Sequence, residues 1–204
     1  YRGLNANMHT TEAFLAVADA TGNNTYRVRA GRIIDHVIEW AEHNGWRIPE
    51  HFKSDWSVDL ECNADKKDDQ FKPYGATPGH GIEWARLIVQ WALSSFANRD
   101  GARPYIDAAE HLFARAVDDA WNVDGAQGLV YTTDWNGMPV VTDRMHWTAA
   151  ESLNTAATLH AATGEARYAD WYATFARYVD EHVIDHEGGS WFHQLDGGNH
   201  VIGT

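Results

Sequence analysis

The stretch "ATGNNTY", residues 20–26, recurs twice along the chain, as "NRDGARPY" at residues 98–105 and as "ATGEARY" at residues 162–168. In each copy a glycine stands four residues before the tyrosine. Gly22, Gly101 and Gly164 suit the left-handed position that closes a helix, and the residues after them suit the start of a new one. We therefore expect three tight turns, each joining two helices.

Runs with helical periodicity flank all three turns. Six helices are expected, over residues 10–20, 26–43, 81–97, 105–121, 148–162 and 168–184. Repeated helical pairs are typical of a solenoid or an α/α toroid, so the chain is predicted to be all-α, with about three helical hairpins.

The links between hairpins, residues 44–79 and 122–146, are long, and an irregular tail follows Asp185. All of them must emerge at one end of the helical layer. "GLVYTTDWNGMPV" (residues 128–140) and "GGSWFHQLDGGNHVIGT" (residues 188–204) alternate apolar and polar residues around Asn-Gly or Gly-Gly. This pattern predicts small β-hairpins capping that end.

Composition narrows the classes of partner. The chain of 204 residues has 16 basic and 29 acidic residues and a formal charge of −13, without a Lys/Arg cluster, so nucleic acid and anionic membranes are not expected partners. No apolar run approaches the roughly 18 residues of a membrane span, and the N-terminus lacks signal-peptide features. The single cysteine, Cys62, favours a reducing, cytoplasmic location. Ten tryptophans and twelve histidines suit a site that handles sugars.

Histidines stand where long links enter the first helix of a hairpin. In "PYGATPGHGIEW", residues 73–84, His80 and Glu83 are three apart, so they share a helix face and can form a hydrogen bond. A carboxylate on one ring nitrogen leaves the other free for proton transfer. A plain helix cap, with Glu83 as a first-turn acid, fits the same two residues.

His9 and Glu12 repeat this spacing, with Asn5 one turn earlier. A metal site is not expected, because the di-metal bundles use the reverse order and further carboxylates. Hydrogen bonds from Asn5 and His9 to substrate hydroxyls fit better.

Aromatic and acidic residues add further candidates. Trp147, in "RMHWTAAES" at residues 144–152, can stack on a sugar or fill the core. The loop "EHFKSDWSVDLE", residues 50–61, offers Asp55, Asp59 and Glu61 as an acid and base pair or as solvated charges.

Three segments, "RGLNANMHTTEAFLAVADATG", "PYGATPGHGIEWARL" and "RMHWTAAESL…ATGEARYADW", together resemble the N-acylglucosamine 2-epimerase family, in particular its mannose isomerase-like branch. The resemblance covers essentially the whole chain and implies an (α/α)6 barrel. It also implies a cofactor-free proton transfer at the carbon next to a sugar carbonyl. The absence of a basic phosphate cradle in the sequence favours an unphosphorylated monosaccharide.

The resemblance assigns roles to individual residues. It implies that His80 is the general acid/base, that Glu83 orients it, and that Asn5 and His9 hold sugar hydroxyls. Trp147 and Glu151 match the aromatic and the acid of a later helix start, although His146 stands where the family often has a second tryptophan.

The family also has a substrate-binding arginine in earlier hairpins and a catalytic histidine in a later Tyr-His motif, and neither is found in this chain. We therefore expect residues 1–204 to be a single domain, the C-terminal part of the barrel, incomplete at both ends. The expected activity is an aldose–ketose isomerase of the mannose-to-fructose kind. A sugar 2-epimerase, an inverting glycoside hydrolase on an α/α toroid and a non-catalytic carbohydrate-binding module are the alternatives.

Overall fold

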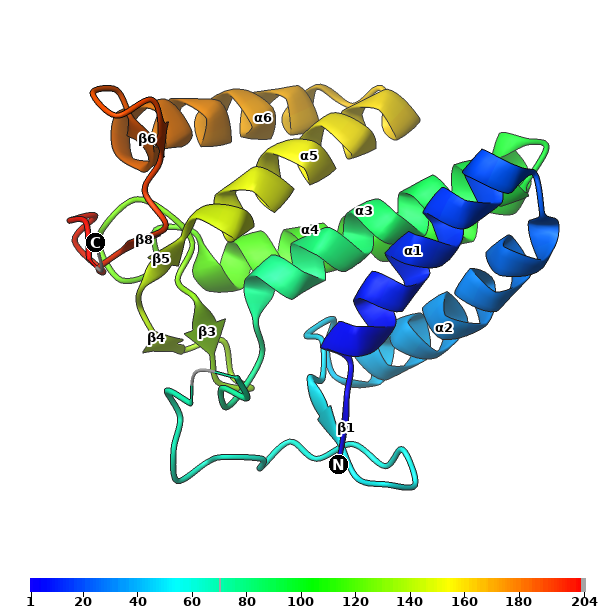
Figure 1. Ribbon diagram of the computed structural model, residues 1–204, viewed down its shortest axis with the longest axis horizontal. Coiled ribbons are helices and arrows are strands. Elements are labelled where there is room, and N and C mark those ends of the chain that lie inside the picture. The colour runs from blue at the N-terminus through cyan, green and yellow to red at the C-terminus, as the bar shows by residue number, and fades with distance from the viewer. Residues whose placement is uncertain (70, 203–204) are drawn as a thin grey trace.

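The computed structural model describes residues 1–69 and 71–202, and in that part of the chain it shows three consecutive helical hairpins (Figure 1). The helices agree with the six predicted from periodicity. Their bounds are α1 Asn5–Thr21, α2 Asn24–His43, α3 Pro78–Ser95, α4 Arg99–Ala120, α5 His146–Thr163 and α6 Ala166–Tyr178, which continues into a π-helical turn, η1 Val179–Val183.

Two of the three predicted glycine caps are present. Gly22 and Gly164 have φ of 70° and 75°, and their N–H groups donate to the carbonyls of Ala18 and His160. The prediction for Gly101 was wrong, because this glycine lies in the first turn of α4. The Asn98 side chain caps that helix by accepting from the Gly101 N–H at 2.9 Å, so the turn closes on an asparagine cap instead of a left-handed glycine.

The core lies around α3. Nearly every residue from Pro78 to Ala92 is buried, as expected for a helix that is packed on all sides. The two helices of the first hairpin, α4 and α5 all contact it. In α2, by contrast, only one stripe is buried, for example Ala30, Ile34, Val37 and Ala41, at the spacing of an amphipathic helix that covers one side of a core.

Short strands occupy the long links. The hairpin of β3 Thr132–Thr133 with β4 Pro139–Val141 turns at Asn136-Gly137, as predicted. In the tail, β6 Ile184–Asp185 pairs with β7 Ser190–Trp191, but β8 Gln194–Leu195 pairs with β5 Arg144–Met145. The predicted turns at Gly-Gly are nevertheless present: β6 and β7 flank Gly188-Gly189, and an antiparallel bridge between Leu195 and Val201 flanks Gly197-Gly198. Residues 203–204 of this segment lie outside the described part of the chain.

One strand pair joins segments that are distant in sequence. β1 Arg2–Gly3 pairs antiparallel with β2 His51–Phe52, with Gly3 opposite His51. This pairing fixes the link after α2 against the start of α1.

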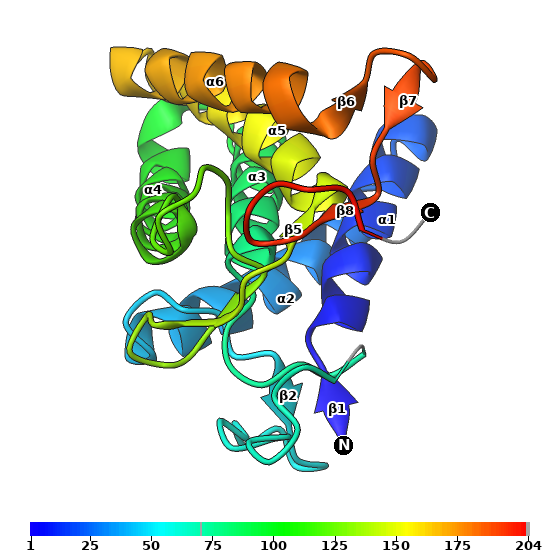
Figure 2. The same ribbon diagram turned by 90° about the vertical axis from the view of Figure 1, so that its left-hand side faces the viewer.

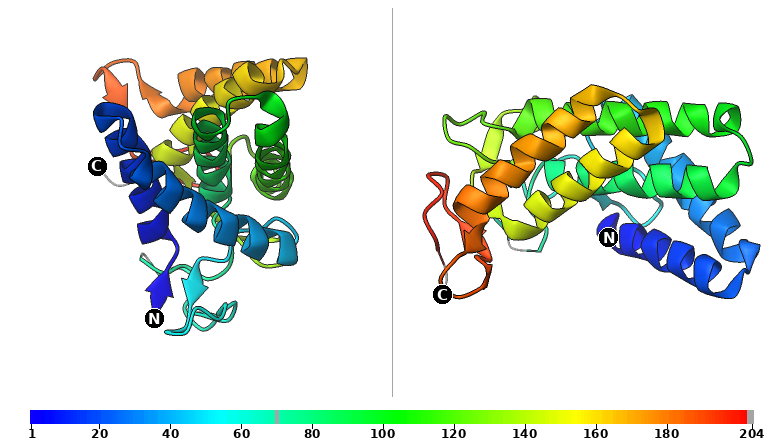
Figure 3. Two further views of the ribbon diagram at one scale, coloured as in Figure 1. Left: turned by 90° about the vertical axis from the view of Figure 1, so that its right-hand side faces the viewer. Right: turned by 90° about the horizontal axis from the view of Figure 1, so that it is seen from above.

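The links and the hairpin turns lie at opposite ends. Figure 1 shows the three turns together on the right and the strands and links on the left and below. The links face the viewer in Figure 2, and the turns face the viewer in the left panel of Figure 3. The first helices of the hairpins therefore all begin at the link end. No helix among the described residues is both long and apolar enough to cross a bilayer.

Candidate active site

A cavity of about 760 Å³ opens at the link end, where α1, α3 and α5 begin. Its walls come from these three helix starts and from the links after α2 and α4. The structure brings together in this cavity the six side chains to which the family resemblance assigns roles: Asn5, His9, His80, Glu83, Trp147 and Glu151.

His80 lies on the first turn of α3 and makes two hydrogen bonds. Its Nδ1 lies 2.8 Å from Oε1 of Glu50, and its Nε2 lies 3.4 Å from Nδ2 of Asn5. The predicted hydrogen bond between His80 and Glu83 was wrong, because Glu50 takes that place. Glu50 belongs to the link after α2, which β1 holds against the site.

Sequence reasoning missed Glu50, although it begins the stretch "EHFKSDWSVDLE". It is 30 residues from His80 and shares no helical period with it. The two meet through tertiary contacts of the link after α2, which pairs with β1 and contacts Pro73 just before α3, so local spacing carries no signal for the contact.

Burial and charge act in opposite directions on His80. Desolvation by burial lowers the pKa of the imidazole, whereas the charge of Glu50, the hydrogen bond to it and the charge of Glu83 raise it. The net effect is a pKa above the ordinary histidine value. A histidine whose free ring nitrogen faces a cavity can exchange a proton there as a general acid or base.

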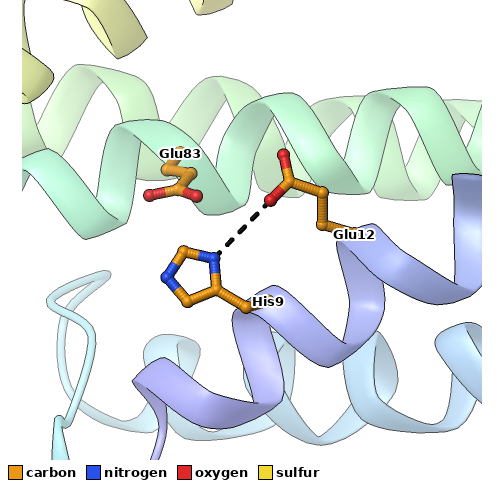
Figure 4. A group of neighbouring side chains, drawn as sticks. All are labelled: His9, Glu12 and Glu83. Atoms are coloured by element: carbon orange, nitrogen blue, oxygen red, sulfur yellow. Dashed lines mark ion pairs between the residues drawn. The ribbon is translucent and has the colours of Figure 1, made fainter.

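His9, Glu12 and Glu83 form a second group in the cavity (Figure 4). The Nδ1 of His9 is 3.5 Å from Oε2 of Glu12, and one ligand atom from each of the three residues lies within 4.8 Å of the others. Glu83 is only 5 % exposed. Burial and the charge of Glu151 raise the pKa of the Glu83 carboxyl, and this outweighs the lowering by neighbouring cationic groups.

Arg86, which sequence reasoning also missed, lies one turn beyond Glu83 and is 5 % exposed. Its guanidinium donates to both oxygens of Glu151, at 2.8 and 3.1 Å, and to Glu12 at 3.3 Å. It also lies 3.9 Å from Glu83. Its hydrogen bonds to Glu151 have the two-pronged geometry that makes arginine–carboxylate pairs strong.

This arginine bears on the metal hypothesis. A histidine and two carboxylates within 4.8 Å could hold a cation. The guanidinium of Arg86 already supplies a positive charge to Glu12 and Glu83, and a cation bound there would compete with it. Glu151 keeps free lone pairs for a hydroxyl group even when both its oxygens accept from Arg86.

Trp147 forms the aromatic wall of the cavity. Its ring lies 5.1 Å from that of His80 and meets Tyr131 edge-on at 6.3 Å. Gly79 allows this close packing: a Cβ added there would lie 2.8 Å from the Trp147 ring and 2.7 Å from a methyl group of Thr148.

Other candidates fall outside the cavity. Asp55, Asp59 and Glu61 are not among its lining residues, and Asp55 is exposed and accepts hydrogen bonds from Ser57. His146 packs against His193, with ring centroids 4.6 Å apart, and lines no part of the cavity either. Although His146 and Trp147 are adjacent in sequence, only Trp147 is among the lining residues of the cavity.

Comparison with known proteins gives one consistent result. The family model of N-acylglucosamine 2-epimerase matches residues 1–204. The chain is 45% identical over 197 residues to a D-mannose isomerase of Thermobifida fusca and 46% identical over 198 residues to one of Pseudomonas cannabina pv. alisalensis, covering 96% of this chain and 48% of each relative. A crystal structure of a D-mannose isomerase superposes with a TM-score of 0.92 at 33% identity, covering 99% of this chain and 51% of that one. The chain thus spans about half the length of the curated relatives it matches.

Proposed function

Because the chain belongs to the N-acylglucosamine 2-epimerase family, we propose that it forms part of an aldose–ketose isomerase acting on an unphosphorylated monosaccharide, of the D-mannose to D-fructose kind. One observation of the site carries the proposal. His80 presents Nε2 beside Asn5 in a cavity, while Nδ1 is bonded to a buried carboxylate.

The chemistry proposed for His80 balances without an external oxidant or reductant. Nε2 takes the proton from C2 of the open-chain aldose, and the C–H electron pair forms the C1=C2 bond of an ene-diol as O1 gains a proton. His80 then returns a proton to C1, O2 loses its proton, and the carbonyl now stands at C2. A single base on one face of the ene-diol is enough for both steps.

The surrounding residues can supply a proton to the developing oxyanion and hydrogen bonds to the sugar hydroxyls. Glu83 is buried and lines the cavity, and burial raises its pKa, so its carboxyl group suits proton exchange with the oxygen that becomes negative. Asn5 and His9 offer an amide and an imidazole to sugar hydroxyls, and Trp147 offers an apolar face. Glu151, fixed by Arg86, adds an oriented acceptor.

The glycoside hydrolase alternative finds less support. Its loop carboxylates, Asp55, Asp59 and Glu61, lie outside the lining of the cavity. We propose a monosaccharide as the partner. A cytoplasmic location agrees with Cys62 being the chain's one cysteine and free.

The test is incubation of the intact protein with D-mannose in heavy water, followed by NMR of the product. We expect a ketose carrying deuterium at C1. His80→Ala should lower turnover by about 100-fold or more, because general acid–base catalysis contributes that much. His186→Ala, at an exposed histidine, is the matched control.

Two outcomes would contradict the proposal. Near-normal mannose-to-fructose turnover by His80→Ala would remove the central assignment. An inverted aldose as the sole product, deuterated at C2, would identify a 2-epimerase instead.

A further inference from the structure

We propose that Glu50 is a positioning residue for His80: it accepts the Nδ1–H of the imidazole and so leaves Nε2 as the nitrogen that exchanges a proton with substrate. This inference rests on the proposed function, because it concerns the state in which His80 acts. The carboxylate and the ring nitrogen are 2.8 Å apart.

Glu50 is held rigidly. It is 6 % exposed, and its carbonyl accepts from the N–H of Leu4 at 3.0 Å. Its neighbour His51 pairs with Gly3 in the β1–β2 ladder and donates through Nε2 to the carbonyl of Pro73 at 2.9 Å. Nδ1 of His51 lies 3.0 Å from the Tyr1 hydroxyl. The carboxylate therefore has a fixed place before any substrate arrives.

A fixed acceptor determines the tautomer. A carboxylate only accepts hydrogen bonds, so Nδ1 must carry a proton. In the neutral imidazole Nε2 then bears the lone pair, and it accepts from the Asn5 side chain at 3.4 Å. That bond is longer than an optimal N–H···N contact, so a substrate can displace it at little cost.

The charge of Glu50 acts together with several other groups near His80. Glu83 lies on the same helix, His9 and Glu12 on α1, and Glu151 on α5. Tyr131 faces the cavity from the link after α4, and the charge of Glu50 adds to burial in raising its pKa. Among the described residues, the ring of His80 forms side-chain hydrogen bonds with Glu50 and Asn5 only, so Glu50 is the one charged group that is bonded to it directly.

The alternative is that Glu50 merely anchors the link to α3. An anchor would affect stability, whereas a positioning residue also affects the titration of His80. Glu50→Gln separates the two, because glutamine has the same shape and still accepts the Nδ1–H but carries no charge. Glu50→Asp keeps the charge and shortens the side chain. Glu42→Gln, at an exposed position on α2, removes the same charge away from the site.

The experiment measures two quantities in the intact protein: the pKa of His80 by NMR titration, and the pH dependence of kcat/KM for D-mannose. In Glu50→Gln we expect the pKa of His80 to fall by about 1 or more, since a nearby opposite charge shifts a pKa by that amount. In this variant the rising limb of kcat/KM plotted against pH should move to lower pH by the same amount. The plateau value of kcat/KM should fall about 10-fold or more. Glu42→Gln should change neither quantity.

Glu50→Asp should keep the pKa of His80 closer to the parent value than Glu50→Gln does. If the glutamine variant fails to fold, Glu50→Asp is compared with the parent, and a His80 pKa lower by about 1 or more would overturn the inference. An unchanged His80 pKa in Glu50→Gln, or an Asp variant that titrates as low as the Gln variant or lower, would overturn the inference. The NMR titration does not depend on turnover, so it tests Glu50 even if His80→Ala shows that the proposed isomerase activity is wrong.

Discussion

Replacing Arg86 with methionine should destabilise the protein strongly. Methionine is similar in length and apolar, so the change removes the charge and the hydrogen bonds while keeping much of the packing. Arg86 is buried, and its guanidinium donates to Glu151 at 2.8 and 3.1 Å and lies 3.9 Å from Glu83. Without it, two poorly exposed carboxylates face each other with no cation between them.

The magnitude follows from the geometry. Unit charges about 4 Å apart attract by about 4 kcal/mol at an effective dielectric constant of about 20. Removing one partner of a buried pair costs about 3–5 kcal/mol, because the other is left uncompensated. Glu12 adds little, since its side chain is 46% exposed. We therefore expect the free energy of unfolding of Arg86→Met to fall by about 3–4 kcal/mol at about pH 8.

The loss should depend on pH. The folded-state pKa of Glu83 is already raised, so its contribution to stability is fully present below the unfolded value and is lost as pH rises through the folded value. Removing Arg86 raises that pKa further. At about pH 5 protonation relieves part of the repulsion, so the deficit should be smaller there than at about pH 8.

Urea unfolding of the intact protein, followed by circular dichroism at both pH values, measures the effect. Arg86→Lys keeps the charge but loses the two-pronged contact, and should lose only about 1–2 kcal/mol. Arg103→Met, on the half-exposed arginine of α4, is the control for loss of a surface ion pair. A loss below about 1 kcal/mol at pH 8, or an equal loss at both pH values, would refute the compensating role of Arg86.

Three further predictions concern the cavity. Glu83→Gln should lower turnover. It should also raise the melting temperature above that of the parent, and more at about pH 8 than at about pH 5, because burial opposes the ionisation of the carboxyl that it removes. Equal changes in melting temperature at both pH values would contradict this. Gly79→Ala should raise KM for mannose, because the added Cβ would meet the Trp147 ring at 2.8 Å. Steady-state kinetics compare it with Gly81→Ala on the same helix, where the added Cβ would lie 3.5 Å from its nearest neighbour, the Cβ of Ala116. Extended dialysis against EDTA should leave turnover unchanged, and inhibition that Zn²⁺ or Mn²⁺ reverses would instead assign a cation to His9, Glu12 and Glu83.

The pairs predicted from helical spacing had mixed outcomes. The His9–Glu12 contact is present at 3.5 Å, because both residues lie on one face of α1. His80 and Glu83 have the same spacing, but Glu50 reaches the Nδ1 of His80 first. Spacing along a helix predicts which side chains share a face. It does not predict which residues from other segments of the chain will form hydrogen bonds with them.

The amino-acid sequence alone determined the six helices, the turns that join them in pairs and the end at which the candidate residues gather. These features depend on periodicity and on local backbone preferences, which act over a few residues. Tertiary structure decided the partners of the buried charges: Glu50 for His80, and Glu151 with Glu12 for Arg86. Those pairs join residues 30 to 74 positions apart, and they form because a buried charge is stable only beside an opposite charge or a hydrogen-bond partner, whichever segment supplies it.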